Sequence, residues 1–108
     1  MRDGLYKVHF QTPLGWGSGI VYAFEGKLWG GDAGIYYVGT YVRDGNQVTA
    51  DVKTDRHTQH PAVTSVFGRD QVRINLTGVA NGDTVKFNGK APEAPDLIFS
   101  AELTRLSD

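Results

Sequence analysis

Apolar and polar residues alternate strictly along most of this chain. The alternation covers residues 6–11, 48–53, 72–77 and 99–104, and it returns more briefly at 85–88. A period of two places one face of a β-strand against a core and the other against water, which is typical of antiparallel sheets. No segment has the 3.6-residue period of an amphipathic helix, so the pattern predicts an all-β protein.

Residue pairs that favour tight turns separate the alternating runs. They are Glu25-Gly26, Asp44-Gly45, Asn81-Gly82 and Asn88-Gly89, and each tolerates the positive φ that short hairpins require. With the alternation, these turns predict about eight strands, over residues 4–11, 17–25, 27–31, 35–43, 47–54, 70–79, 82–88 and 97–105. Pro92 and Pro95 predict a loop before the last strand. Residues 56–69 predict a long connection with a short helical turn around 62–66.

Two segments, 20–24 and 35–42, are apolar on both faces of the expected strands. We expect such strands to be covered on their outer face as well, or to line an interface.

The strand count and the chain length together predict the architecture. A chain of 108 residues has room for one domain, here residues 1–108. Closing the sheet into a single up-and-down eight-stranded barrel removes the exposed strand edges, and a sandwich of two sheets is the competing arrangement. An eight-stranded barrel has an interior just wide enough for side chains or for one small ligand.

Composition and charge exclude several classes of function. The chain has 11 Lys and Arg against 12 Asp and Glu, and this balance argues against nucleic-acid binding, which needs a basic face. It has no Cys, which excludes disulfides, thiolate metal sites and a thiol nucleophile. No apolar run has the length of a membrane span or the form of a signal peptide, so we expect a cytoplasmic protein.

Sequence motifs for catalysis and cofactor binding are missing, so we predict a protein without enzymatic activity or cofactor. The glycine-containing segments lack the spacing of a nucleophile elbow, a phosphate loop or a dinucleotide loop. Asp55, His57 and His60 share one predicted loop and could ligate a metal, although we favour exposed loop residues and predict no metal site. Asp32, among glycines, is either a polar group at a pocket mouth or an Asx-turn, and we favour the turn.

Aromatic residues cluster in the first part of the sequence, where nine of the twelve fall within residues 1–41. Three interpretations remain open: a ligand-lining wall, a self-association surface, or ordinary core filling. The candidate residues of the barrel interior are Tyr22, Phe24, Tyr37 and Tyr41. The candidate partner-binding residues are Tyr36, Val38, Arg43 and Asp44.

Four short motifs in the same region resemble a known family. They are Asp3-Gly4-Leu5-Tyr6, Gly17-x-Gly19, Gly26-Lys27-Leu28-x-Gly30-Gly31-Asp32 and Tyr37-x-Gly39-x-Tyr41. Together they resemble the GrlR-like family, named for a negative regulator of type III secretion. The resemblance implies a lipocalin-like barrel, a homodimer, no enzymatic activity, and regulation through binding of a transcriptional activator. The acidic loop that matters in the founding regulator corresponds here to residues 43–46, which hold one acid, one base and a glycine.

Three hypotheses of function follow, and the least favoured is an enzyme or metal protein built around Asp55, His57 and His60. The first is a non-enzymatic, GrlR-like binding protein that acts through protein–protein contacts, with itself and with a transcriptional regulator as expected partners. The alternative is a lipocalin-like barrel that binds a small apolar ligand in its interior.

Overall fold

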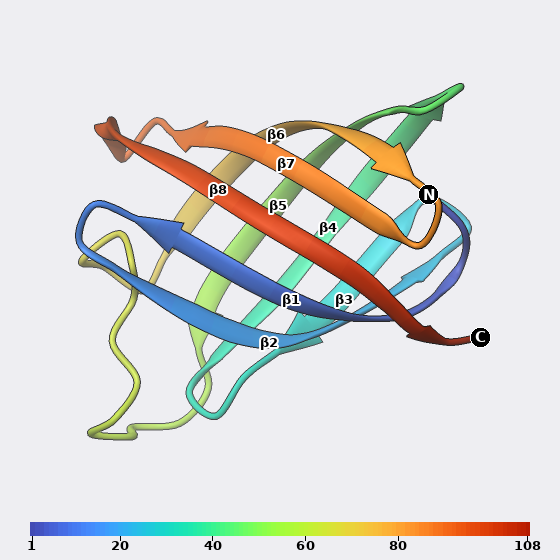
Figure 1. Cartoon of the computed structure of the whole chain (residues 1–108). Coiled ribbons are helices and arrows are strands. Elements are labelled where there is room, and N and C mark those ends of the chain that lie inside the picture. Colours follow the sequence, from blue (N-terminus) through green and yellow to red (C-terminus); the bar gives the residue numbers. More distant parts are fainter.

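The computed structural model describes all 108 residues, which form one closed eight-stranded barrel (Figure 1). Every strand pairs antiparallel with its neighbours in the sequence, and β8 closes the barrel against β1. The strands are β1 (Gly4–Thr12), β2 (Gly15–Phe24), β3 (Lys27–Gly31), β4 (Ile35–Asp44), β5 (Gln47–Arg56), β6 (Val72–Asn81), β7 (Thr84–Ala91) and β8 (Ala94–Ser107). No part of the chain forms a helix of the length and hydrophobicity needed to cross a lipid bilayer.

The all-β class and the eight antiparallel strands predicted from the alternation are confirmed. The predicted helical turn around 62–66 is wrong, since this segment contains only isolated turns. Its carbonyl groups are used elsewhere: Val63 O accepts a hydrogen bond from Arg56, and Val66 O accepts one from Thr12. Side chains outside the segment therefore take the place of the backbone donors that a helical turn would use.

Two of the predicted turn signals also lie inside strands. Asn88 and Gly89 belong to β7, where Gly89 pairs with Leu76 of β6. A Cβ at Gly89 would lie 2.3 Å from the carbonyl oxygen of Asn75, so glycine serves a close backbone approach there and not a turn. Pro95 lies within β8, and the preceding turn consists of Pro92 and Glu93 alone.

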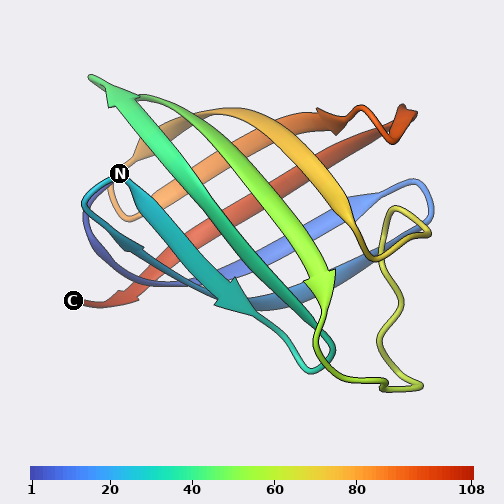
Figure 2. The same cartoon turned by 180° about the vertical axis from the view of Figure 1, so that it is seen from behind.

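The turns divide the barrel into two different ends. One end carries the turns at 13–14, 32–34 and 92–93 together with the long loop 57–71, and we call it the mouth (Figures 1 and 2). The other end carries the tight turns at 25–26, 45–46 and 82–83 and both chain termini. Glu25 and Gly26 have φ of 49° and 81°, which matches the twist of a two-residue hairpin.

Side chains fill the terminal end of the barrel interior. Tyr6 and Met1 are buried there, and the Tyr6 hydroxyl donates a 2.6 Å hydrogen bond to the carbonyl of Arg2. Tyr41 is also buried and donates a 2.9 Å hydrogen bond to Oδ1 of Asp3. Because this end is packed, the free volume of the interior lies toward the mouth.

Candidate functional site

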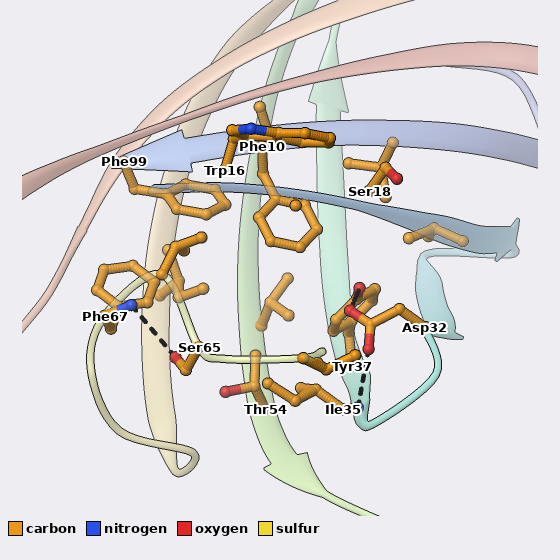
Figure 3. A pocket seen from close by; sticks show the side chains of 18 of the residues that line it. Phe10, Trp16, Ser18, Asp32, Ile35, Tyr37, Thr54, Ser65, Phe67 and Phe99 are labelled. Atoms are coloured by element: carbon orange, nitrogen blue, oxygen red, sulfur yellow. Dashed lines mark hydrogen bonds between the residues drawn. The ribbon is translucent and has the colours of Figure 1, made fainter. Parts of the chain in front are cut away.

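A cavity of about 390 Å³ occupies the mouth half of the barrel (Figure 3). Of the 25 residues that line it, 19 are hydrophobic, so its surface is mainly apolar. Most of the lining residues belong to the strands, the segment 62–67 of the long loop supplies six more, and Asp32 and Ala33 come from the β3–β4 turn. This volume lies within the range of small-molecule sites in proteins.

Aromatic rings form one side of the cavity. Phe99 stacks on Phe10 at a centroid distance of 6.0 Å and on Phe67 at 5.4 Å. Phe10 also meets the ring of Tyr37 edge to face at 6.0 Å. Phe67 belongs to the loop 57–71, so part of this wall depends on the position of the loop. Trp16 stands at the rim and is 68% exposed.

Asp32 and Tyr37 form the polar side of the cavity, across from Phe67 and Phe99 (Figure 3). Oδ1 of Asp32 accepts hydrogen bonds from the backbone N–H groups of Gly34 (3.0 Å) and Ile35 (2.9 Å). Oδ2 of Asp32 accepts a 2.6 Å hydrogen bond from the hydroxyl of Tyr37. Both interpretations of Asp32 therefore hold, because the residue forms an Asx-turn and also lines the cavity.

The environment of Tyr37 keeps its hydroxyl protonated. Burial raises the pKa of Tyr37 far above its ordinary value, and the hydrogen bond to the Asp32 carboxylate raises it further. Tyr37 leans over Gly19 of β2, where a Cβ would lie 2.6 Å from the tyrosine hydroxyl. Glycine at position 19 thus leaves the space that the Tyr37–Asp32 pair occupies.

Arg56 fixes the long loop over the mouth. Its Nε donates a 3.0 Å hydrogen bond to Oδ2 of Asp70, and its Nη2 lies 3.0 Å from Oδ1 of the same carboxylate. The guanidinium also donates to the carbonyls of Thr58 (3.2 Å) and Val63 (3.1 Å). A second anchor is Thr54, whose hydroxyl donates a 2.7 Å hydrogen bond to the carbonyl of Asp70. The start and the end of the loop are therefore tied to β5.

The four residues expected in the barrel interior have different positions. Tyr37 lines the cavity, and Tyr41 points inward but lies in the packed terminal end. Tyr22 and Phe24 correct the prediction, because they are 37% and 43% exposed on the outside of β2. Their neighbours Val21 and Ala23 face inward instead. Tyr6 and Tyr41 already fill the interior at this level, which leaves space only for small side chains.

The outside of β2, β3 and β4 carries a continuous apolar surface. Strand register places Tyr22 beside Trp29 and Trp29 beside Val38, so these three side chains form one row across the strands. We define the outer aromatic face as the exposed side chains Ile20, Tyr22, Phe24, Trp29, Tyr36 and Val38. No other part of the chain covers it. The aromatic residues are therefore divided among the cavity wall, the exposed outer surface and the core.

The candidate partner-binding residues all lie on the surface. Tyr36 and Val38 belong to the outer aromatic face, and Arg43 and Asp44 are exposed at the end of β4. Nη1 of Arg43 donates a 3.0 Å hydrogen bond to the carbonyl of Met1. The hairpin at residues 43–46 is thereby tied to the start of the chain.

Asp55, His57 and His60 are not brought together. His57 contacts the carbonyl of Asp32 through Nε2 at 2.9 Å, whereas His60 Nδ1 accepts a hydrogen bond from the N–H of Ala62. Asp55 accepts a hydrogen bond from the side chain of Gln71. No three His, Cys, Asp or Glu residues form a group that could hold a metal ion.

Several cavity residues were missed among the sequence candidates. Phe10 and Phe99 lie in alternating runs, in phase with buried Val8 and Ala101, so the period of two could have placed them inward. Phe67 lies in an irregular loop, and no periodic signal points to it.

In comparisons with known proteins, no family model and no curated protein matched the chain.

Proposed function

We propose that this protein is a non-enzymatic binding protein that holds a small, mainly apolar ligand inside an up-and-down, lipocalin-like barrel. The observation that carries the proposal is the cavity of about 390 Å³ with its aromatic wall. A barrel that needed its interior only for stability would fill it with side chains, since native cores contain few voids larger than a water molecule. The terminal end is filled in this way, whereas the mouth half is left open.

The polar groups of the cavity suit binding better than catalysis. Asp32 accepts three hydrogen bonds, and Tyr37 is held in its protonated form by burial and by that carboxylate. A general base or a nucleophile needs a neighbour that takes or gives a proton near neutral pH. Tyr37 stays protonated and its hydroxyl hydrogen is held by Asp32, so the pair serves to fix a polar contact.

Filling the cavity tests the proposal. Ala101 is buried on the inner face of β8 and lines the cavity, so Ala101→Phe places a ring in the free volume. Its neighbour Glu102 is exposed, and Glu102→Phe adds the same ring outside the barrel. We expect the neutral fluorescent probe N-phenylnaphthylamine to bind the wild type and Glu102→Phe, and to bind Ala101→Phe at least about tenfold more weakly. Equal binding to all three proteins would place the probe outside the cavity.

A second function, self-association, is favoured by a separate observation, the uncovered outer aromatic face. Soluble monomers rarely expose a contiguous apolar surface of several large side chains, and such surfaces mark interaction sites. Tyr and Trp are enriched in interface cores, and here Tyr22 lies beside Trp29 while Tyr36 lies two residues from Val38, the partner of Trp29 on β4. We therefore propose a homodimer that buries this face.

The GrlR-like resemblance extends this second proposal to a regulatory role. A protein partner such as a transcriptional regulator would take the place of the second copy at Tyr36 and Val38 and would also contact Arg43 and Asp44, all of which are exposed in the single chain. The regulatory role, the partner and the cytoplasmic location remain predictions from the sequence. A direct test is copurification of a tagged chain with any transcriptional activator that is encoded beside its gene, using Val38→Arg as the matched control.

A further inference from the structure

We infer that the cavity selects amphipathic ligands whose polar end donates hydrogen bonds, as in an alkylamine or an alcohol, and that it discriminates against carboxylates such as fatty acids. This inference rests on the proposed ligand-binding function and adds the chemical class of the ligand. It follows from the charges, the hydrogen-bond inventory and the arrangement of the cavity wall.

The residues that line the cavity contribute negative charge and no positive charge. Among the residues that line the cavity, Asp32 is the only one with a side chain that is charged near neutral pH, and none is Lys, Arg or His. The three partners of its carboxylate are all donors, as an ionised carboxylate requires. A ligand carboxylate placed beside it would meet a like charge in a partly desolvated site, whereas an ammonium group would meet an opposite charge.

Nearby cationic side chains do not reverse this charge. Arg56 directly precedes the loop that covers the mouth, and its guanidinium is bound by Asp70 and by two backbone carbonyls. His57 contacts the backbone carbonyl of Asp32 and not its carboxylate. Neither side chain lines the cavity.

Tyr37 and Thr54 offer acceptors at this end. The only hydroxyl hydrogen of Tyr37 is used in the bond to Asp32, so the tyrosine oxygen can accept but cannot donate. The hydroxyl hydrogen of Thr54 is used in the same way, in its bond to the carbonyl of Asp70. A ligand group that donates hydrogen bonds is therefore satisfied beside Tyr37 and Asp32. The hydroxyls of Ser18, Thr64 and Ser65, which also line the cavity, can donate to an accepting group, so the negative charge of Asp32 carries the discrimination against carboxylates.

The apolar and polar sides of the cavity face each other. Phe67 and Phe99 stand on one side, and Asp32 and Tyr37 stand on the other (Figure 3). A bound molecule thus needs an apolar body against the rings and a donor at its other end. Hydrogen bonds to an ionised partner are stronger than neutral ones, so a primary amine should bind more tightly than the alcohol of the same length.

Three probes of equal chain length test this inference on the full chain at neutral pH: decylamine, decanol and decanoate. Binding is followed by the fluorescence of Trp16 in a Trp29→Phe background, because Trp16 stands at the rim and Trp29 lies on the outside. We expect the affinity to fall in the order amine, alcohol, carboxylate, with at least about a tenfold difference between the first and the last. Each probe is kept below its micelle concentration.

Matched variants locate the source of the preference. Asp32→Asn removes the charge and should bring the amine to within about threefold of the alcohol, whereas Asp55→Asn removes a carboxylate outside the cavity and should change nothing. Tyr37→Phe keeps the Asp32 charge and should keep the order of the probes, which tests the inference even if Asp32→Asn does not fold. Equal affinity for all three probes in the wild type would overturn the inference and leave the proposed function intact. Failure of decanol and decylamine to bind at all would overturn both.

Discussion

The hydroxyl of Tyr37 donates a 2.6 Å hydrogen bond to Oδ2 of Asp32, and this bond joins the inner face of β4 to the turn that precedes the strand. The same carboxylate holds the turn together through the N–H groups of Gly34 and Ile35. The polar side of the cavity and the β3–β4 turn are therefore one structure. A change at either residue should affect both local stability and the site.

Alkaline pH should destabilise the fold through its buried tyrosines. Burial raises the pKa of Tyr37, and it is also the largest effect on Tyr6 and Tyr41, whose pKa values are raised as well. A group with a folded pKa above its unfolded value contributes stability that is complete below the unfolded pKa of about 10 and is lost as the pH rises above it. Each such tyrosine lowers the free energy of unfolding by up to about 1.4 kcal/mol per pH unit in that range. Urea denaturation at a series of pH values measures the slope.

The variant Tyr37→Phe isolates one contribution to that slope. At neutral pH it should lower the free energy of unfolding by about 1 kcal/mol, because Oδ2 of Asp32 loses its donor. Above pH 10 the variant should lose stability less steeply than the wild type. An identical slope in the two proteins would show that the pKa of Tyr37 is not raised in the folded state.

Gly19→Ala should disturb the site from the neighbouring strand. The added Cβ would lie 2.6 Å from the hydroxyl of Tyr37 and 2.7 Å from the carbonyl oxygen of Gly31. The tyrosine can move, but the backbone carbonyl cannot, so we expect a loss of about 1–3 kcal/mol in stability and weaker binding of cavity probes. Lys7→Ala, at an exposed position of β1 that does not line the cavity, is the control. If Gly19→Ala has an unchanged free energy of unfolding, β2 and β3 can move apart at this point without a loss of stability.

Arg56→Gln should release the loop over the mouth. It removes the ion pair with Asp70 and weakens the hold on the carbonyls of Thr58 and Val63. We expect faster amide hydrogen exchange within residues 57–71 and faster dissociation of a bound probe, while exchange in the strands stays slow. Arg73→Gln removes an exposed cation from β6 and should leave the loop unchanged. Equal exchange in the two variants would contradict the anchoring role of Arg56.

Trp29→Arg should prevent self-association. Trp29 lies in the middle of the outer aromatic face, between Tyr22 and Val38, and is 45% exposed. We expect sedimentation velocity to find a dimer for the wild type and a monomer for Trp29→Arg. Val79→Arg places the same charge at an exposed apolar position of β6 and should remain dimeric. A wild-type protein that is monomeric at high concentration would remove the second proposed function.

The alternation of apolar and polar residues, together with the turn signals, was sufficient to predict the eight strands, because most strands of a barrel have one buried and one wet face. It could not orient the segment 20–24, where both faces are apolar. Val21 and Ala23 face inward, whereas Tyr22 and Phe24 face outward. This orientation depends on Tyr6 and Tyr41, which come from other strands. Packing between distant parts of the chain therefore decided which aromatic residues were available for the cavity.

Local patterns in the sequence could not predict the cavity. Its wall combines Phe10, Phe67 and Phe99, which are far apart in the sequence and meet only in the closed barrel. The Asp32 interpretation came closer, since both of its expected roles are present. The bond to Tyr37 could not be foreseen, because it depends on the space left by Gly19 in a neighbouring strand.

The pairing of β1 with β8 has a consequence for how the chain folds. All other strand pairs join neighbours in the sequence, and each can form as a hairpin or a meander as soon as its two strands exist. The last pairing joins the two ends of the chain, so its loop-closure entropy is the largest. Phe99, Ala101 and Leu103 all reach the cavity from β8, so the cavity is complete only when this strand has docked. During synthesis, a ligand therefore cannot accelerate any early folding step. It can only bind to and stabilise the barrel after it has closed.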